Sequence, residues 1–112
     1  MAERRAKSLW IKPEYLALIL EGRKTVEVRV AYSNIARLCP GDLLRLNDAH
    51  GYEIVRVGRY ATFDDLLAHE NAAAMAPGLA PDALLAAPRA LYPPEKEALG
   101  VVALAIRPAP AS

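Results

Sequence analysis

The sequence predicts a small α+β domain: a closed or nearly closed mixed β-barrel with short covering helices. Short runs with strand-like alternation or β-branched residues recur along the chain, and short helical patterns interrupt them. A length of 112 residues is enough for one domain with a modest core. We therefore expect a single domain over residues 1–112, with its core at about 8–107 and flexible ends.

The first third of the chain predicts a strand, a helix and a second strand. The strand over Leu9–Ile11 is followed by a helix that begins at Pro13, a residue suited to a first helical position, and stops at Gly22. From residue 25 to residue 30 valine alternates with polar residues. We expect the valines to be buried on one face of this strand and the polar residues to lie on the other.

The remaining elements follow from turns, caps and apolar runs. A turn after Asn47 joins strands over 43–46 and 53–60. Thr62, with Asp65 three residues later, predicts a capped helix over 63–69, and the apolar run 101–106 predicts a buried closing strand.

One segment gives a weaker signal than the others. Residues 71–81, "NAAAMAPGLAP", are rich in Ala, Pro and Gly and are typical of a linker between short helices. A second helical pattern follows at 82–85. We therefore expect 71–81 to be a linker or a flexible arm.

Charge and composition limit the classes of function. The formal net charge of +1 excludes a polycation that holds a duplex by bulk electrostatics, so any nucleic acid must be bound locally. The single cysteine, Cys39, excludes an internal disulfide, and no apolar run approaches the ~20 residues of a membrane helix. We expect a cytoplasmic protein with no membrane partner.

Residues 22–29 are the most informative part of the chain. They read G-x-K-x-x-E-x-R, with Gly22 and Lys24 in the turn and Glu27 and Arg29 on the strand. Two residues along a strand are roughly 7 Å apart on the same face. The pattern therefore predicts a compact site in which Lys24, Glu27 and Arg29 converge on one accessible cleft, although an ordinary solvated ion pair would give the same spacing.

The octet, "IKPEYLALILEG" before it and "CPGD" after it together resemble the signature of the ASCH domain family, relatives of the PUA fold. "VGRYATFDDLLAHE" and "LYPPEKEALGVVALAI" resemble later segments of that family. The resemblance covers residues 8–107, and the octet is its specific part. It implies a PUA-like mixed barrel and, as function, binding of RNA, a nucleotide or a modified nucleoside.

Such a ligand needs cations, an acceptor and a flat wall. Lys24 and Arg29 can hold a phosphate or a base edge, and Glu27 can accept from an exocyclic amino group. Aromatic rings that bases stack on are available at Trp10, Tyr32, Tyr60 and Tyr92, of which Tyr60 is the tyrosine we expect to face the site. The full set of expected binding residues is Trp10, Lys12, Arg23, Lys24, Glu27, Arg29 and Tyr60.

A second hypothesis is a small metal-independent hydrolase that uses the same cleft, with Lys24 as base and Glu27 as the acid that orients water. Some ASCH proteins that this chain resembles remove the acyl group from acylated cytidine, and ribonuclease activity is also attributed to the family. The chain departs from the amidohydrolases, which have threonine where it has Glu27 and a catalytic glutamate that has no clear counterpart here.

A third hypothesis is a protein-interaction adaptor whose cleft is vestigial. No cofactor and no metal is expected, because His50 and His69 are far apart in sequence and neither has a second ligand at close spacing.

Overall fold

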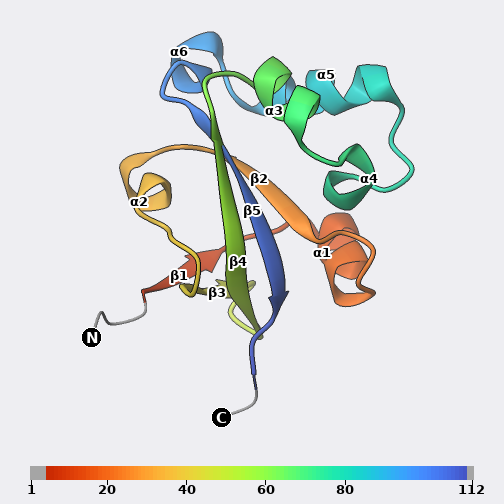
Figure 1. The fold of residues 1–112 in the computed structure, drawn as a ribbon. Helices are drawn as coiled ribbons and strands as arrows, with labels where there is room; N and C mark the ends of the chain where they lie inside the picture. The colour runs from red at the N-terminus through yellow and green to blue at the C-terminus, as the bar shows by residue number, and fades with distance from the viewer. Residues whose placement is uncertain (1–4, 111–112) are drawn as a thin grey trace.

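The computed structural model of the protein describes residues 5–110, and within this range the side chain of Pro81 is left out. The expectation of flexible ends therefore falls partly outside the described residues. Five strands form one curled, half-barrel sheet in the order β1-β3-β4-β5-β2 (Figure 1). β1 and β3 are parallel, and the other neighbours are antiparallel. The strands are β1 Ala6–Leu9, β2 Val26–Val30, β3 Leu43–Leu46, β4 His50–Tyr60 and β5 Val101–Pro108.

Within residues 5–110, six short helices connect the strands. α3, α4, α5 and α6 lie together at one end of the sheet, and β1, β3 and the end of β5 lie toward the other (Figure 1). None of the described helices is long and apolar enough to cross a membrane. The helices are α1 Pro13–Leu20, α2 Ser33–Ala36, α3 Phe63–His69, α4 Ala72–Met75, α5 Pro81–Leu91 and α6 Pro94–Glu97.

β5 separates two hydrophobic clusters. Val102 and Leu104 pack into the cluster inside the curled sheet, while Val101 and Ala103 pack into a second cluster against α3 and α4. A strand that is covered on both faces needs apolar side chains on both, which explains its continuous apolar run. The predicted buried strand is confirmed, and it lies between β4 and β2 rather than at the edge of the sheet.

Several predicted elements are confirmed, and two expectations were wrong. α1 begins at Pro13, β3 has the predicted bounds, and the Thr62 hydroxyl accepts from the Asp65 amide at the start of α3. The first strand, however, ends at Leu9. The next two residues leave the sheet because the Asn47 side chain bonds both the amide and the carbonyl of Ile11, at 2.7 and 2.9 Å.

The second wrong expectation concerns residues 71–81, which are not a simple linker. Asn71 caps α4 by accepting from the Ala73 amide, and Met75, in the last turn of that helix, is only 4% exposed. The Thr25 amide donates to the Ala74 carbonyl at 2.9 Å, which fixes α4 to the start of β2. This segment is therefore part of the packed structure.

Candidate functional site

The turn after α1 directs Lys24 inward. Gly22 has φ +80°, its amide donates to the Ile19 carbonyl at 3.0 Å, and the Arg23 amide donates to the Leu18 carbonyl at 2.9 Å. This pair of bonds is the Schellman motif, which requires a left-handed residue and so favours glycine. The motif ends the helix and reverses the chain just before Lys24.

Lys24 is a buried cation with three acceptors around it. Its side chain is 6% exposed, and its Nζ donates to the carbonyls of Val26 and Met75, each at 2.7 Å. The Glu27 carboxylate lies 3.2 Å from the same nitrogen, and the Tyr15 ring centroid lies 5.8 Å away. An ammonium group has three N–H donors, so these acceptors account for all of them.

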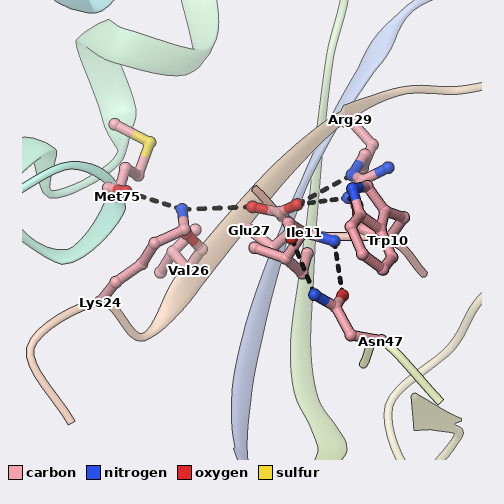
Figure 2. Close-up of polar contacts among 8 residues, drawn as sticks. All are labelled: Trp10, Ile11, Lys24, Val26, Glu27, Arg29, Asn47 and Met75. Atoms are coloured by element: carbon pink, nitrogen blue, oxygen red, sulfur yellow. Dashed lines mark hydrogen bonds and ion pairs between the residues drawn. The ribbon is translucent and has the colours of Figure 1, made fainter. Parts of the chain in front are cut away.

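Glu27 lies between the two cations of the motif. Its second carboxylate oxygen accepts from Arg29 Nε at 2.8 Å and lies 2.7 Å from Nη2 (Figure 2). Nη2 also donates to the Trp10 carbonyl at 2.8 Å, which ties β2 to the segment after β1. The prediction that Lys24, Glu27 and Arg29 converge is therefore confirmed, but Lys24 and Glu27 are buried rather than solvated.

These three side chains line one cavity of about 310 Å³, which we call the Lys24 cavity. Exposed Trp10 and Leu91 line it where it meets solvent, and Val28, which we expected to be buried, lies partly exposed on its wall. Most of the other walls come from α3, from the end of α4 and the residues after it, and from α5. They are formed by Phe63, Leu66, Leu67, Met75, Ala76, Leu79, Leu84, Ala87, Pro88 and Tyr92.

Trp10 and Lys12 also line the cavity, as the sequence predicts for them, but two other expected residues do not. Arg23 is exposed and lies 3.7 Å from Glu21. Tyr60 donates a hydrogen bond to Glu70 and stacks on His69 with the ring centroids 5.7 Å apart.

The reason for the position of Tyr60 is a register shift in β4 between Ile54 and Arg56. A shift of one residue moves every later side chain to the other face of the sheet. Arg56, Gly58 and Tyr60 therefore share the face that meets Glu70. Tyr15 and Tyr92, rather than Tyr60, are the tyrosines that line the cavity among the described residues.

The sequence reasoning missed most of the cavity wall. Met75 provides both a wall side chain and the carbonyl that binds Lys24, and the two residues are 51 positions apart. The sequence does contain two helix signals in this region: Asn71, a good helix cap, and Pro81, a good first helical residue. They indicate helices, but not that those helices face Lys24.

The cavity combines an apolar environment with a local excess of positive charge. Burial lowers the pKa of the Lys24 amine below its usual value, and the Glu27 carboxylate opposes this shift without cancelling it. Burial also raises the pKa of the Tyr92 hydroxyl. Among residues 5–110, no group of three or more His, Cys, Asp or Glu is arranged to hold a metal ion.

The half-barrel sheet and its covering helices define a small PUA-like barrel. The ASCH domain family model matches residues 9–110, so the chain belongs to the ASCH domain family, which is generally associated with RNA binding.

The solved structures that are similar to the chain include the following two. The crystal structure of hypothetical protein PH0355 has a TM-score of 0.88 and 25% identity, covering 93% of this chain and 99% of that one. The solution structure of protein PF0455 from Pyrococcus furiosus has a TM-score of 0.76 and 25% identity, covering 97% and 100%. A search of curated proteins gives no significant match.

Proposed function

We propose that the domain binds single-stranded RNA by inserting one nucleoside, or a modified nucleoside, into the Lys24 cavity. The observation that carries this proposal is the group formed by buried Lys24 and Glu27 and partly exposed Arg29, in a cavity whose other walls are mainly aliphatic and aromatic. A volume of about 310 Å³ is at the lower end of the range for small-molecule sites. The cavity therefore suits one nucleoside rather than a length of strand.

The polar atoms of Glu27 and Arg29 suit the edge of a base. Glu27 can accept from an exocyclic amino group, and within residues 5–110 Arg29 Nη1 has no hydrogen-bond partner, so it can donate to a carbonyl or a phosphate. Tyr92 and Phe63 supply flat walls, with their ring centroids 6.1 Å apart. Stacking on such rings is a common way to hold an unpaired base.

The aliphatic walls favour a base that carries an alkyl or acyl group. A polar ring edge that leaves water without finding a partner loses free energy, whereas an apolar substituent gains from burial. The side chains of Leu79, Leu84 and Ala87 offer no hydrogen bond. Base modifications that add carbon atoms fit this part of the cavity better than additional polar groups do.

The alternative, a metal-independent hydrolase, is supported by the lowered pKa of Lys24, because a neutral amine can act as a base. The surroundings of Lys24 and of Glu70 favour binding instead. Lys24 already donates to two carbonyls and faces Glu27, so its lone pair is not directed at a substrate. Glu70, a further acid in the chain, is bound to Arg56 and Tyr60 and does not line the cavity.

The test is a titration with unmodified nucleosides, acylated and alkylated nucleosides, and a short single-stranded RNA. The variant Ala87→Phe fills the cavity from α5, and Ala86→Phe places the same ring on the neighbouring exposed position. We expect Ala87→Phe to abolish binding and Ala86→Phe to leave it unchanged. Equal binding by wild type and Ala87→Phe would overturn the proposal, and release of free nucleoside by the wild type would favour the hydrolase.

A further inference from the structure

The two edge strands of the sheet leave an open seam. β1 and β2 stand at opposite ends of the strand order, and within residues 5–110 no backbone pairing joins them. The bond from Arg29 to the Trp10 carbonyl bridges the seam. Beside this bridge lies a second cavity of about 220 Å³, the seam pocket, whose lining includes Lys7, Ser8, Trp10, Arg29, Tyr32 and Asn34.

The seam pocket adjoins the Lys24 cavity. Trp10, Arg29 and Tyr92 line both. The Tyr92 ring lies 6.1 Å from Phe63 on the side of the Lys24 cavity and 6.4 Å from Tyr32 on the side of the seam pocket, measured between ring centroids. A row of aromatic rings therefore leads from one site to the other, with Arg29 at their junction.

The seam pocket has the chemistry of a nucleotide site. Its lining includes the cations Lys7 and Arg29 and no carboxylate, and Lys96 Nζ lies 5.7 Å from the centroid of the Tyr32 ring. Tyr32 is 38% exposed, so its ring is accessible. Cations that follow a phosphate backbone and rings on which bases stack are the two components of single-strand recognition.

We propose that the seam pocket binds a second nucleotide of the same RNA strand, adjacent to the one in the Lys24 cavity. This inference rests on the proposed function. The first base enters the Lys24 cavity, the linking phosphate lies at Arg29 Nη1, and the second base stacks on Tyr32 with Lys7 near its phosphate. The minimal ligand is therefore a dinucleotide, and the strand leaves the cavity through the seam between β1 and β2.

The experiment compares a mononucleotide with two dinucleotides by equilibrium titration. The mononucleotide is the 5′-monophosphate of the nucleoside that binds best in the panel above, and uridine extends it on the 3′ side or on the 5′ side. Stacking of one base on an aromatic ring is equivalent to roughly five- to hundredfold in affinity. We expect one of the two dinucleotides to bind about tenfold more tightly than the mononucleotide.

Variants assign that gain to the seam pocket. Tyr32→Ala removes the ring and is expected to abolish the gain while leaving mononucleotide affinity unchanged, whereas Tyr32→Phe keeps it. Lys7→Gln is expected to lower dinucleotide affinity several-fold, and Arg45→Gln, which removes the same charge from an exposed position outside both sites, is not.

Two results would overturn the inference. If both dinucleotides bind no better than the mononucleotide, or if Tyr32→Ala weakens all three ligands equally, the seam pocket is not a nucleotide subsite although the Lys24 cavity remains one. If the wild type binds neither mononucleotides nor dinucleotides, the proposed function itself fails.

Discussion

Glu27 and Glu70 are both carboxylates held by an arginine and a second polar group, yet only one of them adjoins a cavity. Glu27 lies between Lys24 and Arg29, and its side chain is 11% exposed. Glu70 accepts from both ends of the Arg56 guanidinium, at 2.9 and 2.7 Å, and from Tyr60, and its side chain is 3% exposed. Similar local chemistry therefore produces a candidate site in one case and a structural link in the other.

The difference lies in what surrounds each group. Around Glu70 the glycine at position 58 allows close packing, since a Cβ there would lie 2.7 Å from the carboxylate. Around Glu27 a cavity lined by residues of β2, of α3 and of the segment from Met75 to Tyr92 leaves room, and Arg29 Nη1 is unpaired within the described residues. A buried ion pair indicates a ligand site only when a donor and a volume remain free beside it.

The largest expected effect is on stability at Lys24. Lys24→Met leaves two carbonyls without their donor and removes one of the two cations beside the buried Glu27 carboxylate, so we expect the free energy of unfolding to fall by about 3–4 kcal/mol. Arg56→Met removes a half-exposed partner from Glu70, which keeps the Tyr60 hydroxyl as a donor, and should cost less than Lys24→Met. Urea denaturation measures both, and equal losses would contradict the difference drawn between the two clusters.

The second effect is on binding at Arg29. Arg29→Met removes the free Nη1 donor, and because a hydrogen bond to a charged group contributes about 1.5–3 kcal/mol, we expect nucleoside affinity to fall at least about tenfold. Arg56→Met, which removes an arginine from the other cluster, is the control and should bind as the wild type does. The account would be wrong if the two variants lost affinity to the same extent.

A smaller effect is expected at the turn that directs Lys24 inward. No atom lies within 4 Å of the position a Cβ would take at Gly22, so Gly22→Ala is opposed only by its φ of +80°. A left-handed alanine should cost about 1–2 kcal/mol. Gly51 does not have a positive φ, and a Cβ there would make ordinary contact with Ala109. Gly51→Ala should therefore lower stability less than Gly22→Ala in the same thermal unfolding series.

The smallest expected effect is on the pH dependence of stability, which should also differ between the Glu27 and Glu70 regions. Hydrogen bonds from Arg56 hold the pKa of Glu70 below its usual value, so the unfolded chain takes up this proton at a higher pH than the folded one. The stability from Glu70 is therefore complete above the ordinary glutamate pKa and is lost as the pH falls through the folded value. Glu70→Gln should flatten the acid limb of the stability curve, which denaturation at several pH values would measure.

Lys24 should act at the other end of the pH range. Its lowered pKa means that the unfolded chain binds more protons than the folded chain between the folded and the ordinary lysine pKa, so stability rises as the pH increases through that window. Lys24→Met should remove this rise. If Lys24→Met altered the acid limb of the stability curve instead, the burial of Lys24 would not be the cause of the pH dependence.

The polar part of the site could be predicted because it depends on local geometry. Gly22 fixes the turn, and alternation along β2 places Glu27 and Arg29 on one face. The resemblance to ASCH domains then indicated which strand to consider. The burial of Lys24 could not be predicted, because it depends on the carbonyl of Met75, and a main-chain acceptor leaves no mark in the sequence.

The walls could not be predicted for a different reason. Residues 71–81 have no strong hydrophobic period, since alanine fits helices and loops alike, and their position is set by tertiary contacts such as the bond from Thr25 to the Ala74 carbonyl. The choice of Tyr60 was wrong because the register shift in β4 reverses the side-chain alternation after Ile54. Bulges of this kind have no reliable signal in a single sequence.

The most direct test of the central claim, that the Lys24 cavity binds a nucleoside of an RNA strand, is an NMR titration of backbone amides with a short single-stranded RNA. We expect the largest shift changes in residues 24–29, in α3 and in residues 75–92, and none of these changes in Ala87→Phe. Shift changes confined to surfaces outside the two cavities, or the same changes in wild type and Ala87→Phe, would contradict the account.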